Sequence, residues 1–127
     1  MKRCFNCLED LTSNSCNNCG FKNSNLKLNN SALKPGTLLD GRYYLGRVLG
    51  QGGFGITYIA SDEIMGGIVA VKEHYPKAIV QRAPNGLDVL TDNKTEFNDG
   101  LKKFTDEARA LAKFKNHPNI VAVISYQ

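Results

Sequence analysis

The sequence contains no tryptophan, and its cysteine is confined to one end of the chain. All four cysteines lie within the first 19 residues, and the other 108 of the 127 residues include none, which excludes a disulfide framework spread over the protein. No stretch approaches the roughly 20 apolar residues of a membrane-spanning helix. The N-terminal segment MKRCFNCLED has basic residues without an apolar core behind them, so we expect no signal peptide and a cytoplasmic location.

A large excess of charge of either sign is also lacking. The net charge is +4, from 16 Lys and Arg against 12 Asp and Glu, and the basic residues are scattered apart from Lys102-Lys103. This distribution gives no electrostatic footprint for nucleic acid. A hydrophobic content of 42% and a charged content of 22% are those of an ordinary globular protein, and 127 residues are about the length of one domain.

The cysteines follow the pattern C-x2-C-x8-C-x2-C, with Gly20 directly after the last of them. Each C-x-x-C pair has the length that wraps two thiolates around one metal ion, and four thiolates form a closed, structural tetrahedral site. Two disulfides would need an oxidising compartment, and a redox C-x-x-C belongs in a βαβ unit that this segment lacks. We therefore predict a zinc ribbon at residues 1–22, whose folding energy comes from Zn²⁺ held by Cys4, Cys7, Cys16 and Cys19.

Residues 23–40 are rich in Asn, Ser and Lys, with isolated apolar residues and a Pro-Gly pair near the end, so we expect a flexible linker. Three stretches rich in β-branched and aromatic residues follow at 43–49, 56–60 and 68–72. Their order is strand, glycine-rich loop, strand, turn and strand. This order predicts an antiparallel meander.

The first loop of this meander carries Gly50, Gly52 and Gly55 in the spacing G-x-G-x-x-G. Such a loop brings backbone N–H groups close to a phosphate, and Lys72 on the third stretch adds a positive charge. A dinucleotide site requires a helix to begin at the glycines, whereas Ile-Thr-Tyr-Ile follows here, and no Gly-Lys-Ser/Thr completes a Walker A loop. Two interpretations remain, a different kind of nucleotide-phosphate site and a mobile hairpin without a ligand.

The loop Gly-Gln-Gly-Gly-Phe-Gly and the strand Val-Ala-Val-Lys resemble the start of a protein kinase domain. The resemblance implies an α+β fold, in which residues 41–127 form a truncated kinase N-lobe with an antiparallel sheet and one helix. It also implies ATP, with Mg²⁺ in complete kinases, as the ligand. Thr57 stands where kinases usually have valine, which is nearly isosteric but apolar. The nucleotide contacts implied are Leu49, Gly50, Gln51, Gly52, Gly53, Phe54, Gly55, Thr57, Ala70 and Lys72.

Residues 73–90 contain two prolines and an Asn-Gly turn, so we expect an irregular excursion. Its Lys-Glu-aromatic-x-Pro start resembles certain bacterial Ser/Thr kinases that carry an insertion here. A helix is predicted at 95–115 with Thr95 as N-cap, because apolar residues recur at spacings of 4, 3, 4 and 3 at Phe97, Leu101, Phe104, Ala108 and Leu111.

Glu107 borders the apolar stripe of this helix. The kinase resemblance gives it an ion pair with Lys72 that orients the lysine on the phosphates. The alternative is an ordinary flanking carboxylate. After the helix, His-Pro-Asn at 117–119 precedes a predicted strand at 120–126, and we expect that strand to lack a neighbour, because kinases place a further strand between it and 68–72.

The sequence contains neither the His-Arg-Asp catalytic loop nor the Asp-Phe-Gly motif of protein kinases. We therefore predict the ATP-binding portion of a Ser/Thr protein kinase, which binds ATP poorly and does not transfer phosphate by itself. Transfer to protein substrates is what the complete family does. The alternative is a non-catalytic adaptor, in which the ribbon and the lobe fragment form a binding module whose partner the sequence does not indicate.

Overall fold

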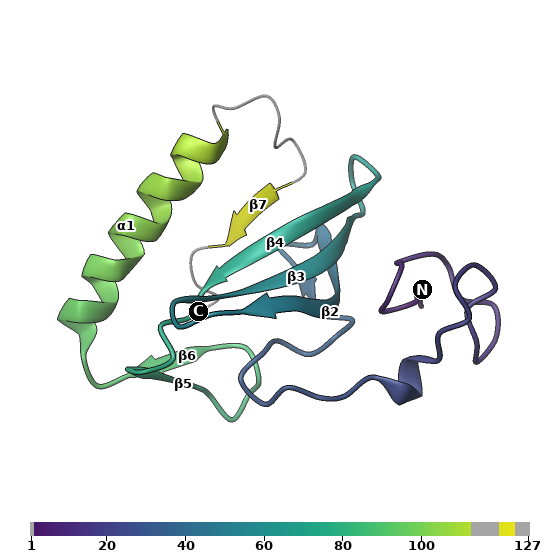
Figure 1. Ribbon diagram of the computed structural model, residues 1–127, viewed down its shortest axis with the longest axis horizontal. Coiled ribbons are helices and arrows are strands. Elements are labelled where there is room, and N and C mark those ends of the chain that lie inside the picture. Colours follow the sequence, from purple (N-terminus) through teal and green to yellow (C-terminus); the bar gives the residue numbers. More distant parts are fainter. Residues whose placement is uncertain (1, 113–119, 124–127) are drawn as a thin grey trace.

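A computed structural model describes residues 2–112 and 120–123 of the chain (Figure 1). Residues 2–22 form a compact unit without regular strands, here called the cysteine ribbon, and η1 (Asn23–Asn25) follows it. The remaining elements are β1 (Leu38–Leu39), β2 (Tyr43–Gln51), β3 (Gly55–Asp62), β4 (Ile68–His74), β5 (Val80–Arg82), β6 (Val89–Thr91), α1 (Lys94–Ala112) and β7 (Ile120–Val123). The predicted α+β class is confirmed.

Five strands form one curled sheet in the order β1-β2-β3-β4-β7, and β5 and β6 form a separate hairpin. The pairs from β1 to β4 are antiparallel, as the predicted meander requires. The three predicted strands at 43–49, 56–60 and 68–72 are all present, and each is longer than its sequence pattern. Figure 1 shows α1 at one end of the sheet and the cysteine ribbon at the other.

Strand β7 was expected to lack a neighbour, and this expectation is wrong. It pairs in parallel with β4, and Ala70, Val71, Lys72 and Glu73 lie opposite residues 120–123. The free edge of β4 offers unpaired N–H and C=O groups, and a neighbouring strand is the direct way to satisfy them. Residues 117–119 and 124–126, which complete the predicted turn and strand, lie outside the described residues.

Helix α1 begins at Lys94 and is capped by Asn93. The Glu96 N–H donates to Asn93 Oδ1 over 3.1 Å, and Asn93 Nδ2 donates to the Glu96 carboxylate over 2.9 Å. This reciprocal pair satisfies a free N–H of the first turn, so the prediction of Thr95 as the N-cap is wrong by two residues. In the described part of the chain, no helix has the length and apolar character required to cross a membrane.

The main core lies on one face of the sheet. Alternate residues of β3, namely Ile56, Tyr58 and Ala60, point into it and are at most 1% exposed. This alternation follows from the two-residue period of a strand. The core is completed by residues from β1, β2, β4, α1, the hairpin and the segment before β1, among them Leu33, Leu39, Leu45, Val71, Val89 and Phe97.

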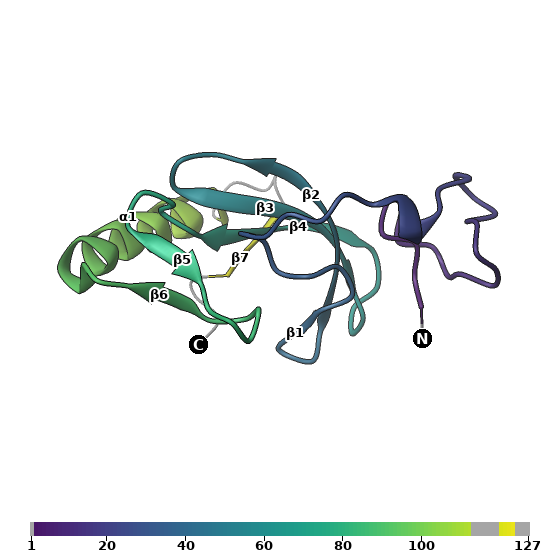
Figure 2. The same cartoon turned by 90° about the horizontal axis from the view of Figure 1, so that it is seen from below.

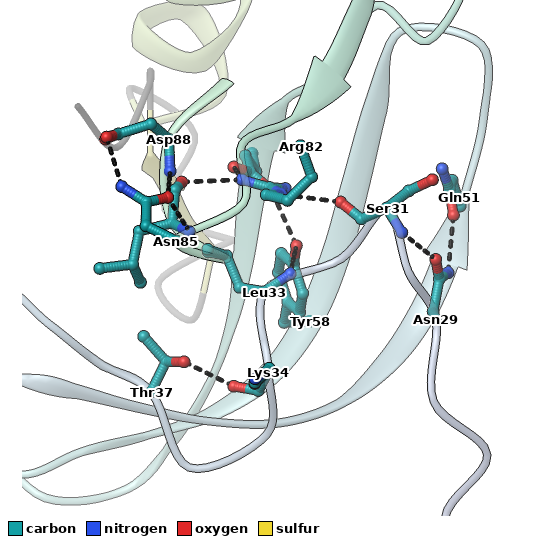
Figure 3. Close-up of polar contacts among 12 residues, drawn as sticks. Asn29, Ser31, Leu33, Lys34, Thr37, Gln51, Tyr58, Arg82, Asn85 and Asp88 are labelled. Atoms are coloured by element: carbon teal, nitrogen blue, oxygen red, sulfur yellow. Dashed lines mark hydrogen bonds and ion pairs between the residues drawn. The ribbon is translucent and has the colours of Figure 1, made fainter. Parts of the chain in front are cut away.

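The segment at 23–40, predicted as a flexible linker, packs on the sheet instead. Leu33 is 2% exposed, and its N–H donates to the Tyr58 hydroxyl over 3.0 Å (Figure 3). Further toward the ribbon, Asn29 donates to the side-chain oxygen of Gln51 over 2.8 Å. Ala32, Leu33 and Leu39 of this segment are therefore anchors in the core, whereas Leu28 remains 78% exposed. Burying the three anchors offsets the entropy of ordering the polar residues around them.

The expected irregular excursion at 73–90 contains a short hairpin. Strands β5 and β6 pair antiparallel, with Arg82 opposite Val89. The turn between them holds Asn85, whose side-chain oxygen accepts from the N–H groups of Leu87 and Asp88, and Gly86 has a φ of 77°. The Asn-Gly pair is thus a turn, as its chemistry indicates.

A buried ion pair connects this hairpin to the sheet. The guanidinium of Arg82 donates to both carboxylate oxygens of Glu73, over 2.7 Å and 2.9 Å, and the Tyr58 hydroxyl donates to the same carboxylate over 2.7 Å. The side chains of Arg82 and Glu73 are 5% and 0% exposed. Arg82 also donates to the carbonyls of Ser31 and Leu87, so its charge is satisfied on several sides (Figure 3).

Removing Arg82 should strongly destabilise the fold. We expect Arg82→Met to lower the free energy of unfolding by about 3–5 kcal/mol, because it leaves the Glu73 carboxylate buried without a cation. Arg42→Met is the matched control, since Arg42 makes a bidentate pair with Asp62 but is 36% exposed. Asp62 is 7% exposed but keeps hydrogen bonds from the backbone N–H groups of Ile64 and Met65, so this variant should cost less, about 1–2 kcal/mol. Urea unfolding followed by circular dichroism measures both, and equal losses would contradict the prediction.

Helix α1 packs against a buried histidine at the end of β4. His74 is 2% exposed, and its ring lies 5.0 Å from that of Phe97 and 5.4 Å from that of Phe104. Within the described residues, neither ring nitrogen has a hydrogen-bond partner. Burial in this apolar setting lowers the pKa of His74 below its ordinary value of 6.5, because the charged form loses its hydration.

The folded chain should therefore lose stability in mild acid. Above pH 6.5 His74 is neutral in both the folded and the unfolded chain, and below it the unfolded chain binds the proton more readily. We expect the free energy of unfolding to fall as the pH drops from 6.5 towards 5. His74→Phe should flatten this slope in urea titrations, and an unchanged slope in the variant would show that another group is responsible.

Candidate nucleotide-binding site and metal centre

The predicted phosphate-binding residues lie in one row across three strands. Gly50 on β2 pairs with Thr57 on β3, and Thr57 pairs with Lys72 on β4. Residues directly opposite each other in an antiparallel pair point to the same face, so Thr57 and Lys72 share a face. Ala70 and its partner Ile59 lie two positions further along that face. The opposite face, with Tyr58 and Val71, is the core.

The glycine-rich turn itself is held by the chain beyond β4. The Tyr75 N–H donates to the Phe54 carbonyl over 3.0 Å, and the Lys77 N–H donates to the Gly53 carbonyl over 3.1 Å. Both bonds use carbonyl oxygens of the turn. In the described part of the chain, the N–H groups of Gly53 and Phe54 have no backbone acceptor.

Gly55 is required for a different reason from the other glycines of the loop. A Cβ placed on it would lie 2.9 Å from the backbone oxygen of Glu73, whereas a Cβ on Gly50, Gly52 or Gly53 would have no atom within 4 Å. Gly55 therefore allows β3 and β4 to approach where the loop joins the sheet.

The other residues predicted to contact the nucleotide differ in their exposure and in their hydrogen bonds. Leu49 at the end of β2 is 46% exposed and Phe54 at the tip is 79% exposed, as suits open positions beside a ligand. Gln51 is engaged elsewhere, because its side-chain oxygen accepts from Asn29 (Figure 3). Thr57 and Ala70 are half-buried on the open face.

The structure does not bring Lys72 and Glu107 together. Both side chains are exposed, and the four ion pairs found among the described residues include neither of them. Among residues 94–107 of α1, whose burial the structure describes, Phe97 is buried and Leu101 and Phe104 are half-buried, while the side chains of Ala108 and Leu111, which were to complete the apolar stripe beside Glu107, lie outside the described part. The pairing implied by the kinase resemblance stays a prediction.

The four cysteines converge into one cluster. Their sulfur atoms all lie within 4.8 Å of one another, and the sulfurs of Cys4 and Cys19 are 3.6 Å apart and those of Cys7 and Cys16 are 3.5 Å apart. Metal–sulfur bonds of about 2.3 Å in a tetrahedron place sulfurs about 3.8 Å apart, so the cluster has the dimensions of a four-thiolate site.

Two matching turns present these cysteines. The Leu8 N–H donates to the Cys4 carbonyl, and the Gly20 N–H donates to the Cys16 carbonyl, each over 2.8 Å. Leu8 and Gly20 both have a positive φ, of 68° and 81°. The first turn thus repeats the second with leucine in place of glycine, which the sequence pattern did not reveal.

Hydrogen bonds favour the negatively charged thiolate form at two of the four cysteines, Cys16 and Cys19. A hydrogen bond from the Asn6 amide lowers the pKa of Cys19 to about 6, and the Cys19 N–H lowers the pKa of Cys16. Burial raises the pKa of Cys4 to about 11 in the absence of a cation. A bound divalent ion would compensate this cost directly, because it deprotonates a coordinating thiol.

Sequence reasoning did not single out Glu73, although its position in the strand carries a signal. Glu73 lies two residues after Val71 and four after Val69, so the period of the strand places all three on the core face. A carboxylate at a core position needs a cation, and Arg82 nine residues later provides it.

The chain is similar to bacterial protein kinases, although no family model matches it. Serine/threonine-protein kinase B of Synechocystis is 32% identical over 90 residues, which are 69% of this chain and 13% of that protein. The probable kinase PknB of Bifidobacterium longum is 36% identical over 93 residues, covering 73% and 11%. The DNA damage-responsive kinase RqkA of Deinococcus radiodurans is 36% identical over 92 residues, covering 72% and 11%.

A solved structure, the apo form of PpkA-294, shares the fold with a TM-score of 0.63 and 32% identity, over 69% of this chain and 31% of that one. The sheet and helix of this chain have the fold of a protein-kinase N-lobe, and the curated relatives that the chain matches are bacterial serine/threonine kinases. The chain spans only 11–13% of the length of the curated relatives it matches. The comparison therefore covers only the region of the kinase N-lobe, and it does not assign the activity of those complete proteins to this chain.

Two glycines of the loop should respond differently to the same substitution. Gly55→Ala should lower the free energy of unfolding by about 1–3 kcal/mol, because its new methyl group overlaps the Glu73 carbonyl. Gly50→Ala meets open space and should change it by less than about 1 kcal/mol. Urea unfolding of the two variants checks this, and equal effects would argue against the close approach.

Proposed function

We propose that this chain is the ATP-binding portion of a serine/threonine protein kinase, preceded by a structural zinc ribbon. The observation that carries the proposal is the row of Gly50, Thr57 and Lys72 across adjacent strands, below a turn whose Gly53 and Phe54 N–H groups have no backbone acceptor within the described residues. The row places a cation beside a cradle of backbone donors, which is the arrangement that binds nucleotide phosphates.

The 127 residues supply nucleotide contacts but no general base and no Mg²⁺ ligand of the kinase type. Transfer of the γ-phosphoryl group to a protein hydroxyl is therefore proposed for the complete kinase and not for these residues. Half of the nucleotide cleft is contributed by the other lobe in kinases, so we expect weak binding of MgATP here. A cytoplasmic location, where ATP is present, fits this proposal.

The metal proposed for the cysteine ribbon is Zn²⁺. Four thiolates in a closed cluster select a soft or borderline ion, and tetrahedral four-sulfur sites typically hold zinc or iron. The residues fit the ion, because the two turns at Cys4–Cys7 and Cys16–Cys19 already present their sulfurs at suitable separations. Bound Zn²⁺ would provide folding energy and no open coordination position for chemistry.

A titration of the ¹⁵N-labelled chain with MgATP tests the nucleotide site. We expect amide shifts centred on residues 50–57 and 70–72, and Lys72→Met should weaken binding about tenfold or more by removing a charged phosphate contact. Lys103→Met is the matched control, because Lys103 is an exposed lysine on α1, and it should leave the affinity unchanged.

The same titration separates the two candidate functions. Shifts that spread over the whole surface, or an affinity that Lys72→Met does not alter, would remove the nucleotide-binding proposal. That result would favour a non-catalytic adaptor, in which the ribbon and the kinase N-lobe serve as a binding module.

A further inference from the structure

The cysteine ribbon does not stand apart from the kinase N-lobe but is docked on strand β2. Figures 1 and 2 both show it at the end of the sheet away from α1. The Arg47 N–H on the free edge of β2 donates to the Phe5 carbonyl over 2.9 Å. Just before this point, the Leu45 carbonyl accepts from the Gly36 N–H and the Leu45 N–H donates to Thr37. The segment before β1 and the cysteine ribbon therefore bond to successive residues on the same edge of β2.

Gly46 allows the two parts to approach each other closely. A Cβ on Gly46 would lie 2.7 Å from the Phe5 carbonyl oxygen and 2.8 Å from a methyl group of Leu8. A glycine inside a strand marks a place where another backbone approaches closely. Leu8 is 2% exposed, so its side chain is buried at this contact.

An ion pair strengthens the same interface. The guanidinium of Arg3 donates to both carboxylate oxygens of Glu63, over 2.7 Å and 2.8 Å, and their side chains are only 18% and 24% exposed. Arg3 also donates to the Leu8 carbonyl over 3.0 Å, so the same side chain braces the first cysteine turn.

The docking atoms belong to the metal-binding turn itself. Phe5 lies between Cys4 and Cys7, and Leu8 follows Cys7 and is held by its bond to the Cys4 carbonyl. Of the described ribbon residues, only Cys4, Leu8 and Cys16 are buried, and two of these three are metal ligands. The ribbon therefore has almost no apolar core to keep this turn in shape without the metal.

We propose that the metal ion of the cysteine ribbon controls the order of strand β2, and through it the glycine-rich loop of the kinase N-lobe. The metal fixes the Cys4–Cys7 turn, this turn presents the Phe5 carbonyl and Leu8, and these groups hold the β2 edge at Gly46 and Arg47. Strand β2 continues from Arg47 to Gln51, directly before Gly52, although its pairing with β3 is irregular at two places. Loss of the metal therefore loosens the strand that carries the loop. The inference rests on the metal site of the proposed function.

Hydrogen exchange of the full chain tests the proposal. The ¹⁵N-labelled chain is loaded with Zn²⁺ and then stripped with a chelator, and a zinc-binding dye measures the ion released. We expect one Zn²⁺ per chain, and at least tenfold faster exchange of the Arg47 amide after stripping. The Val71 amide in the centre of the sheet should change much less.

Two variants and a matched control connect the effect to the interface. Gly46→Val should still bind one Zn²⁺, and its Arg47 amide should exchange fast with or without the metal. Because Ile59 also lies near this position, Arg3→Ala provides a second variant that leaves the sheet unchanged, and it should reduce the metal-dependent protection of Arg47. Arg42→Ala removes a bidentate pair within the kinase N-lobe, and it should retain the full metal dependence.

The possible failures are distinguishable. A chain that binds Zn²⁺ but whose Arg47 exchange is the same before and after stripping overturns this inference alone. A chain that binds no Zn²⁺ overturns the metal site together with it, while MgATP shifts centred on the glycine-rich loop would still support the nucleotide-binding part of the proposed function.

Discussion

The buried ion pair between Glu73 and Arg82 is the constraint on which much of the structure depends. Neither charge can remain in the core without the other, so the hairpin that carries Arg82 must stay against the strand that carries Glu73. The same two side chains engage the hydroxyl of Tyr58 and the carbonyl of Ser31 (Figure 3). One charge pair thus fixes two segments that have little regular structure of their own.

This pair also shapes the candidate site, because Glu73 directly follows Lys72 in β4. The two residues point to opposite faces of the sheet, one into the core and one toward the proposed nucleotide. Anchoring Glu73 therefore fixes the backbone from which Lys72 extends. Directly after β4, the N–H groups of Tyr75 and Lys77 donate to carbonyls of the glycine-rich turn, so the same stretch of chain also holds the turn in place.

The sheet and the cysteine cluster were predictable because their signals are local, namely strand alternation, turn residues and the spacing of ligand pairs. The packing of 23–40 was not, because Leu33 and Leu39 look like isolated apolar residues until β3 provides their partners. The helix start was misplaced because Asn93 and Thr95 are both good caps, and only backbone geometry selects between them. Gly46 carried an overlooked signal, a glycine in the interior of a strand.

The parallel pairing of β4 with β7 has a consequence for how the sheet could grow. A strand inserted between them would run antiparallel to both, so β7 would move outward by about one strand spacing, roughly 4.8 Å, without reversing its direction. In the present arrangement β7 makes β4 an interior strand. The part of β4 that carries Lys72, from Ala70 to Glu73, is therefore shielded from pairing with a second chain.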